Sequence, residues 1–195
     1  MIFKTKRLIL RPPRKSDWKD VVEGANDIEV SKNLLVVPHP YKKKDAIKWI
    51  NSTIKKWKSK NKKDYTFFIE LKSEGKVIGA TSLHKIDKEH GVANTGSWIN
   101  KKYWRRGYIL EAKVPILDFA FGKLKLRKIE TVAFVENIAS NSMSLKLGFK
   151  HEGLKRKAIV CKATGKIHDE NIYGLLKEEW LNKRKEIIRE IAGRN

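Results

Sequence analysis

Three segments rich in aromatic and β-branched residues follow one another with no helix between them, and this order constrains the fold more than any other feature. They cover residues 65–71, 76–84 and 92–99. The chain then reads helix, strand, helix, strand and strand over residues 107–124, 128–135, 140–147, 151–162 and 166–176. A meander of antiparallel strands that continues as strand–helix–strand predicts a mixed α/β sheet, because helices do not follow every strand as they do in a doubly wound sheet or a barrel.

The two ends of the chain complete this prediction. A strand over 6–11 stops at Pro12 and Pro13, two helical patterns follow before residue 60, and the tail from Glu178 is amphipathic. We expect a mostly antiparallel central sheet of about seven strands flanked by helices, with a C-terminal helix. We predict one domain over 1–178, and a helix over 179–195 that packs on the domain or extends from it.

The composition excludes several classes of protein. No apolar run reaches the ~18 residues that span a bilayer, and the N-terminus has no pattern of a signal peptide. Cys161 is the only cysteine, so no internal disulfide can form, which favours a reducing cytoplasm. The five histidines show no metal-ligand spacing, so we expect no metal.

The net charge of +22 favours polyanionic partners such as RNA, the ribosome or a phosphorylated cofactor. Lysine enrichment from genome bias or life at high temperature explains the same charge without any partner. Charge does not decide between a monomer and a homodimer.

Gly107 separates the strand that ends near Ile99 from the helix that follows. A helix N-terminus presents amides without intrahelical partners and a partial positive charge, and Arg105 and Arg106 stand directly before it. Two guanidinium groups beside such amides suit a pyrophosphate. The stretch is neither a Walker A loop nor a GxGxxG fingerprint.

A second cluster, ENIASNSMSLKLGF, covers residues 136–149. Asn137 follows an apolar strand, Ser140 is placed to cap the next helix, and Ser144 lies one turn further along the same helix face. Capping alone accounts for Ser140, and a single helical serine such as Ser144 is usually inert.

Taken together, these motifs resemble the GNAT superfamily of acetyl-CoA-dependent N-acetyltransferases, most closely the branch with the ribosomal-protein alanine N-acetyltransferases RimJ and RimL. The resemblance is carried by GSWINKKYWRRGYILEA over 96–112, by Asn137 and Ser140 with KLGFKHEG over 146–153, and by Asp169, Tyr173 and the EEW at 178–180. It covers residues 7–180 in order.

The resemblance implies how acetyl-CoA binds. The strands over 92–99 and 128–135 should splay apart, the pantetheine arm should pair with backbone at Trp98 and Ile99, and Asn137 should contact the arm. The turn amides that should bind the pyrophosphate belong to Arg105, Arg106, Gly107, Tyr108, Ile109 and Leu110. The family has Gly or Ala where Ile109 stands, so this side chain either faces the core harmlessly or crowds the phosphates.

The resemblance also defines the catalytic candidates. The family often uses a glutamate base on the strand over 92–99, but the matching position here is Asn94. Substitute bases are Glu70, His84 and Asp169. Ser144 stands where the family often has a tyrosine that protonates the departing thiolate, so Ser140 or water is the alternative acid, and Asn137 completes the candidate set.

We therefore expect an N-acetyltransferase that acts on an amine, with the α-amino group of a ribosomal or other protein favoured as acceptor. A polyamine or aminoglycoside acetyltransferase is one alternative, and acidic residues lining the acceptor groove would favour it. A noncatalytic RNA- or ribosome-binding module on the same fold is the other.

Overall fold

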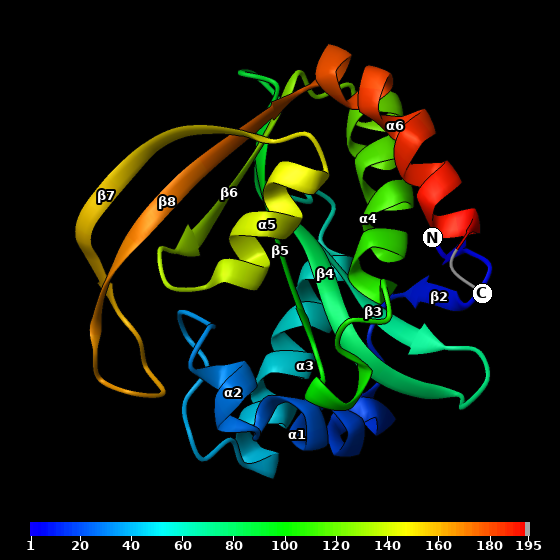
Figure 1. Ribbon diagram of the computed structural model, residues 1–195. Coiled ribbons are helices and arrows are strands. Elements are labelled where there is room, and N and C mark those ends of the chain that lie inside the picture. Colours follow the sequence, from blue (N-terminus) through cyan, green and yellow to red (C-terminus); the bar gives the residue numbers. More distant parts are fainter. Residues whose placement is uncertain (194–195) are drawn as a thin grey trace.

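The computed structural model describes residues 1–193 and contains one eight-stranded sheet in the order β1-β2-β3-β4-β5-β6-β8-β7 (Figure 1). Its strands are β1 (Phe3–Lys4), β2 (Leu8–Arg11), β3 (Tyr65–Leu71), β4 (Lys76–Asp87), β5 (Val92–Ile99), β6 (Lys128–Phe134), β7 (Lys150–Val160) and β8 (Ile167–Leu176). Only β5 and β6 are parallel; every other neighbouring pair is antiparallel. The mixed, mostly antiparallel sheet is confirmed, with one strand more than the seven expected.

The helices occupy the intervals that the periodicity predicts, with one addition. They are α1 (Trp18–Ala25), α2 (Ile28–Ser31), α3 (Lys43–Lys58), α4 (Tyr108–Asp118), α5 (Ile138–Lys146) and α6 (Lys177–Ala192). The addition is α2, a single turn whose N-cap Asp27 accepts a hydrogen bond from the Glu29 amide. The helix expected over 107–124 is α4 followed by a π-helical turn over Phe119–Lys123.

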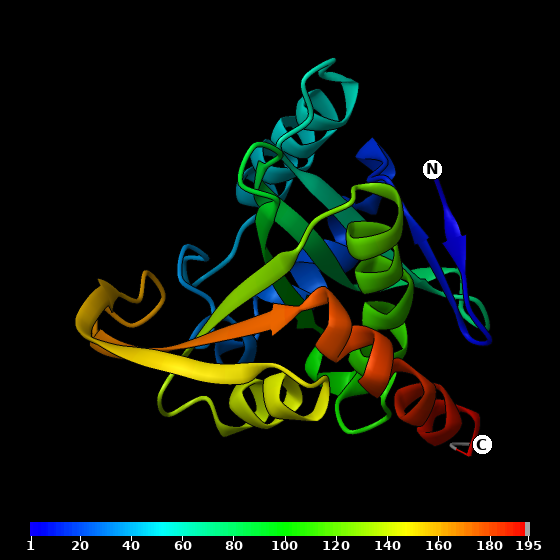
Figure 2. The ribbon, with the colours of Figure 1, turned by 90° about the horizontal axis from the view of Figure 1, so that it is seen from above.

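The helices cover both faces of the sheet. Helices α1, α2 and α3 lie on one face, whereas α4, α5 and α6 lie on the other (Figures 1 and 2). The long β7–β8 hairpin curves away from the sheet toward the chain that follows α2 (Figure 1). There, the Lys162 amide donates to the Leu35 carbonyl over 3.3 Å.

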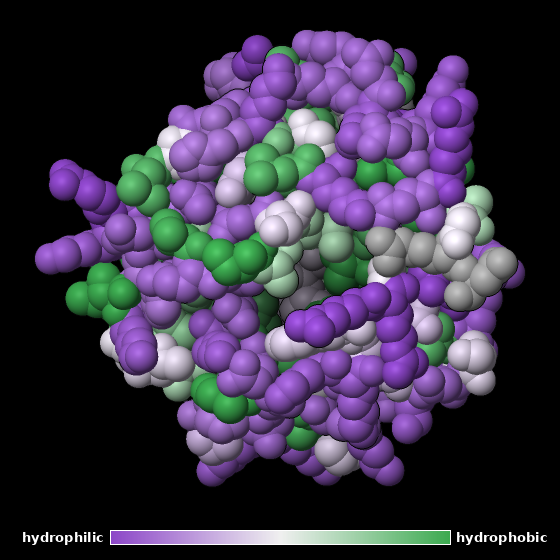
Figure 3. Space-filling view, viewed as in Figure 1, coloured by the Kyte–Doolittle hydropathy of each residue, from purple (hydrophilic) through white to green (hydrophobic). Residues whose placement is uncertain are grey.

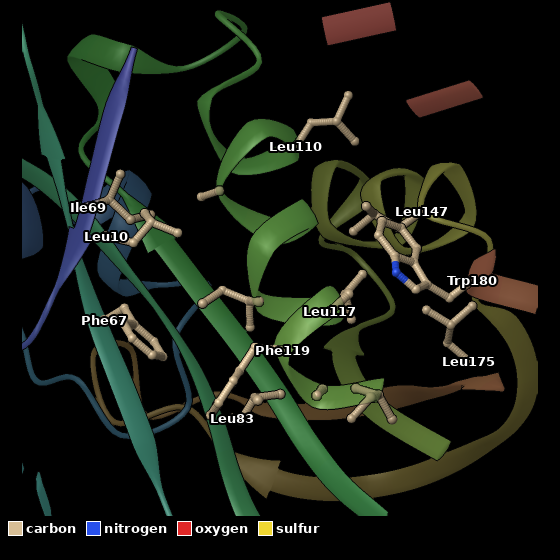
Figure 4. Close-up of a cluster of buried hydrophobic side chains, with 14 of the residues drawn as sticks. Leu10, Phe67, Ile69, Leu83, Leu110, Leu117, Phe119, Leu147, Leu175 and Trp180 are labelled. Carbon is tan, nitrogen blue, oxygen red and sulfur yellow. The ribbon is translucent and has the colours of Figure 1, made fainter. Parts of the chain in front are cut away.

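The larger core fills the space between the sheet and α4 and α6. In Figure 4, Leu10, Phe67 and Ile69 of the sheet lie on one side of α4, whereas Leu110 and Leu117 project from its other side, where Leu147 and Trp180 lie. The α6 side chain Trp180, which is fully buried, belongs to the same cluster (Figure 4). Helix α6 therefore shares the core of the sheet; residues 194 and 195 of the predicted tail lie outside the described residues.

A smaller core on the opposite face joins α1 and α3 to the sheet. Trp49 of α3 stacks on Phe68 with ring centroids 5.0 Å apart, and it also meets Trp98 of β5 at 6.3 Å. A Cβ at Gly24 of α1 would come within 2.7 Å of the Trp98 ring, so only glycine fits there. The side chain of Trp98 thus faces α1 and α3, away from α4.

Helix α5 is capped differently from the prediction. Its N-cap is Asn137, whose Oδ1 accepts a 3.1 Å hydrogen bond from the Ser140 amide. Ser140 is therefore the third residue of the helix, and the prediction that it is the cap is wrong. Because asparagine is as good an N-cap as serine, the sequence alone does not separate the two candidates.

Candidate active site

A fork between β5 and β6 forms the centre of the site. The two strands pair only at Val92↔Lys128, Ala93↔Ile129 and Asn94↔Glu130. One residue further on, the Thr131 hydroxyl donates to the Thr95 carbonyl over 3.0 Å, and beyond it β6 makes no ladder pair with β5 within residues 1–193. The expected cofactor residues Trp98 and Ile99 lie on the part of β5 that β6 leaves unpaired.

The turn before α4 has the geometry of an anion site. Gly107 is the N-cap and adopts a left-handed conformation with φ of 75°, and Arg105 also has a positive φ, of 62°. The first intrahelical bond runs from the Glu111 amide to the Gly107 carbonyl. The amides of residues 108–110 come before that bond, so they have no acceptor within the helix. They lie at the positive end of the helix dipole, next to Arg105 and Arg106 in the chain.

Glu111 anchors this turn to the start of the chain, a role that the sequence pattern does not indicate. Its buried carboxylate accepts from the Thr5 hydroxyl and from the Arg7 amide and Nε, at 2.6 to 2.8 Å. The Arg7 guanidinium also lies over the Tyr108 ring, 4.4 Å from its centroid. The β1–β2 segment therefore holds the first turn of α4 in place.

Ile109 packs against the larger core and is partly buried. Of the two orientations considered, the structure therefore has the side chain of Ile109 directed toward the core. The backbone amide of Ile109 remains in the first turn of α4.

The serines of α5 lie one helical turn apart and hydrogen-bond to each other. The buried Ser144 hydroxyl donates to the Ser140 carbonyl over 3.0 Å, so its proton is directed into the helix. Asn137 stands at the end of β6, with its side-chain oxygen engaged in capping.

Asn141 joins α5 to two strands and was not among the expected residues. Its Nδ2 donates to the carbonyls of Phe134, Val135 and Asn137, and its Oδ1 accepts from the Asn171 amide and the Tyr173 hydroxyl. Sequence reasoning missed it because these partners on β6 and β8 are up to 32 residues away.

Two of the three substitute bases are engaged elsewhere. Glu70 pairs with Arg11 at 2.5 Å, in a cluster where Arg11 also forms a bidentate pair with Asp17. Asp169 accepts the Lys157 amide over 2.6 Å in the β7–β8 hairpin. Neither carboxylate is among the residues that line the cavity beside the fork.

His84 is closer to the fork. It stands opposite Asn94 in the β4–β5 ladder, and a Cβ at Gly96 would lie 3.7 Å from its Cε1. Its Nδ1 lies 3.3 Å from the Ser82 hydroxyl. Burial lowers the pKa of His84, so the imidazole is neutral at physiological pH and able to accept a proton.

A cavity of about 510 Å³ opens beside the fork on the face covered by α1 and α3. Figure 3 shows that this view of the molecule is mainly hydrophilic and hollowed near its middle. Gly96, Ser97 and Trp98 of β5 form the floor, and the segment 34–38 forms a wall. The remaining lining residues are Val21, Ala25, Tyr41, Asp45, Lys48, Trp49, Ser52, Thr66, Ala80, Thr81, Ser82 and Lys162.

Comparisons with known proteins match this architecture. The model of the acetyltransferase (GNAT) domain matches residues 7–150. The chain belongs to the GNAT acetyltransferase family. It is 31% identical to the uncharacterized N-acetyltransferase YnaD of Bacillus subtilis, covering 92% of this chain and 99% of that protein. It is 34% identical to the putative ribosomal N-acetyltransferase YdaF of the same organism, covering 55% of this chain and 57% of YdaF. A crystal structure of a GNAT acetyltransferase from Bacillus anthracis superposes with a TM-score of 0.76 at 28% identity, covering 91% of this chain and 99% of that one.

As a GNAT enzyme, this chain is an acetyl-CoA-dependent N-acetyltransferase. The residues present fit acetyl-CoA: the start of α4 offers amides and arginines to a pyrophosphate, and the fork offers unpaired β5 backbone to the pantetheine arm. Among residues 1–193, no three His, Cys, Asp or Glu side chains cluster as a metal site would need. Within the same residues, no helix is both long and apolar enough to cross a membrane.

Proposed function

We propose that this GNAT acetyltransferase acetylates the α-amino group of a protein or peptide whose first side chain is apolar. The observation that carries the proposal is the lining of the cavity beside the fork. Aromatic and aliphatic side chains dominate it, including Trp49, Trp98 and Tyr41, and its volume is in the range of small-ligand sites. A side chain held there would sit next to Gly96, beside the strand at which acetyl transfer occurs in this family.

The charges in the cavity disfavour a polyamine or an aminoglycoside. Asp45 is the only carboxylate in the lining, and it already accepts the Lys42 amide at the start of α3. The other charged lining residues are Lys48 and Lys162. A polycation would meet two like charges without a free acid, which costs binding energy. YdaF, whose name refers to ribosomal acetylation, adds support for a protein acceptor.

The mechanism we propose assigns each step to a residue near the fork. Amides at Tyr108, Ile109 and Leu110, with Arg105, Arg106 and the Gly107 cap, hold the pyrophosphate, and the β5 backbone at Trp98 and Ile99 with Asn137 aligns the arm. When bound, acetyl-CoA supplies the acetyl group as a thioester. His84, neutral and beside Gly96, removes the proton of the acceptor ammonium through water.

A panel of acceptors tests the proposal. Peptides that differ only in the first residue (Phe, Leu, Ala, Asp) are incubated with enzyme and acetyl-CoA, alongside spermidine and kanamycin. We expect α-amino acetylation with the largest kcat/KM for Phe or Leu. A larger kcat/KM for spermidine or kanamycin would overturn the proposal.

Two matched variants locate the acceptor. Val36, which lines the cavity, and Val160 of β7, which does not, are both more than half exposed. We expect Val36→Glu to lower kcat/KM for the Phe peptide at least about tenfold, because a carboxylate at the wall opposes an apolar side chain. Val160→Glu should leave kcat/KM unchanged; equal effects would place the acceptor elsewhere.

A further inference from the structure

Lys113 of α4 is a buried lysine at the fork. It is 4% exposed, and its Nζ donates to the Thr95 hydroxyl over 2.7 Å and to the Gly96 carbonyl over 3.4 Å. Neither acceptor is a carboxylate. The helix that binds the cofactor phosphates at its start thus carries, in its second turn, an amine directed at β5.

The environment of this amine is unusual for lysine. An ammonium has three N–H donors, and the described residues provide two acceptors, so the third donor meets no protein partner. Burial without a counter-charge lowers the pKa of Lys113 to about 7. Such a group exchanges a proton readily near neutral pH.

The position of Lys113 coincides with the point where the strands part. Its acceptor Thr95 follows the last ladder pair between β5 and β6, and the Thr95 carbonyl receives the Thr131 hydroxyl from β6. Its other hydrogen-bond acceptor, Gly96, lines the cavity proposed for the substrate amine. Nζ of Lys113 therefore lies on the α4 side of β5, and the other side of β5 faces the substrate amine.

The reaction needs an acid that the serines of α5 supply poorly. Ser144 directs its hydroxyl proton into the Ser140 carbonyl, and a serine hydroxyl is a weak acid in any case. A lysine ammonium at the fork is a far stronger acid than either serine.

We propose that Lys113 is the proton donor to the sulfur of CoA as it departs. The acceptor nitrogen bonds to the acetyl carbon, the carbon–sulfur bond breaks, and its electron pair goes to sulfur. The third Nζ proton of Lys113 then bonds to that sulfur, leaving CoA as a thiol and Lys113 as a neutral amine. The acceptor ammonium loses two protons in all. The first leaves through water to His84 before the attack and passes to solvent; the second leaves the nitrogen through water once the bond to the acetyl carbon has formed, and it restores the charge of Lys113.

The other charged groups on the elements packed against α4 leave Lys113 without a partner. Within α4, Glu111 is bound to Arg7, and Asp118 is bound to Arg184 of α6. Arg11 of β2 is held by Asp17 and Glu70, and β5 carries no charged residue. On β4, His84 responds to Lys113: the charge of the lysine lowers the pKa of His84 in addition to the effect of burial.

Titration of bound CoA tests the proposal independently of any acceptor. CoA is added to the purified enzyme, and its thiolate absorbance in the ultraviolet is followed against pH for wild type and for Lys113→Met. With wild type, we expect the thiolate of bound CoA to appear at least about one pH unit below the pKa of free CoA, because the thiolate and the Lys113 ammonium stabilise each other and titrate as a pair, the thiolate raising the pKa of Lys113 in turn. With Lys113→Met, which keeps the length of the side chain, the bound thiol should titrate as free CoA does.

Three controls make the result decisive. Lys123→Met, at an exposed position past the end of α4, should titrate as wild type. Thr95→Val removes the main hydrogen-bond acceptor of Lys113 but keeps the lysine amine. If Lys113 acted only by positioning Thr95, Thr95→Val would titrate as Lys113→Met does. Lys113→Gln replaces Lys113→Met if the latter fails to bind CoA. Identical thiol titration in wild type and in either Lys113 variant would overturn the proposal.

Discussion

At the scale of single residues, Ile109 shows how a departure from a family pattern is accommodated. A β-branched side chain in a phosphate-binding turn threatens the approach of the ligand to the backbone. Here the side chain turns into the core between α4 and the sheet, and the amide stays at the helix start. The residue therefore contributes to stability rather than to ligand contact.

Ile109→Ala should thus lower the free energy of unfolding by about 2 kcal/mol, the low end for large-to-small core changes, because Ile109 is only partly buried. The dissociation constant of acetyl-CoA should stay within about twofold of wild type. On one preparation, denaturant titration measures the free energy of unfolding and calorimetry measures the dissociation constant. Val114→Ala, at another partly buried position of α4, is the control. Tighter acetyl-CoA binding with unchanged stability would mean that Ile109 faces the phosphates.

Lys113 gives a prediction for the dependence of stability on pH. Its pKa of about 7 in the folded protein lies below its ordinary value of 10.5. Between these values the unfolded chain binds a proton that the folded chain does not, so the contribution of Lys113 to the free energy of unfolding rises with pH. Its destabilising effect is largest below pH 7.

We therefore expect Lys113→Met to be more stable than wild type at pH 6 by several kcal/mol, the order of magnitude set by that pKa difference. The advantage should shrink progressively toward pH 10. Urea unfolding at several pH values measures the difference, and a constant gap across the range would contradict a buried charge at this position.

At the scale of helices and strands, periodicity and turn residues predict most of the boundaries. Strands β3 and β5 lie where the aromatic and β-branched runs place them, since each run is bounded by clear turn or loop signals. Strand β1 has two residues and α2 has four, and both are too short to produce a pattern. Strand β4 extends to Asp87 past a bulge after His84, which alternation alone does not reveal.

Two buried side chains of α6, Trp180 and Ile187, dock the helix on the core, and Trp180 is the larger. Trp180 fills the core and its Nε1 donates to Asp118 of α4 over 2.9 Å. We expect Trp180→Ala to lower the free energy of unfolding by about 3–5 kcal/mol. Leu181→Ala, at a neighbouring position that is mostly exposed, should change it by less than about 0.5 kcal/mol. Thermal and urea unfolding compare the two variants, and equal losses would show that α6 contributes little to the core.

At the scale of the whole molecule, the charge of +22 predicts association with polyanions. Because each phosphate contact releases counterions, the affinity for RNA should fall steeply, by at least about tenfold, between roughly 50 and 200 mM salt. Fluorescence anisotropy with a labelled RNA measures this, and dextran sulfate serves as a polyanion without bases. An affinity that salt does not change would indicate that the lysines serve solubility alone.

The candidate site could be predicted only where its residues are neighbours in sequence. The turn at Gly107 belongs to a local motif with a local physical cause, whereas the sequence does not decide between Asn137 and Ser140 as the cap of α5. The contacts of Lys113 with Thr95 and of Asn141 with Tyr173 join residues 18 and 32 positions apart. Nothing in the local pattern marks such a lysine, because a single cation in a helix is typical of an exposed face.

The fork also has a consequence for cooperativity. Within residues 1–193, three register pairs make up the ladder between the five-stranded part of the sheet, β1 to β5, and the three-stranded part, β6, β8 and β7. Apart from these pairs, the two parts are joined mainly through the core beneath α4 and α6. A substrate arm lying in the fork acts as a missing strand between two half-sheets, so occupancy couples their local opening. Amide hydrogen exchange should therefore slow in both half-sheets together when acetyl-CoA is present, although the ligand touches few of those amides.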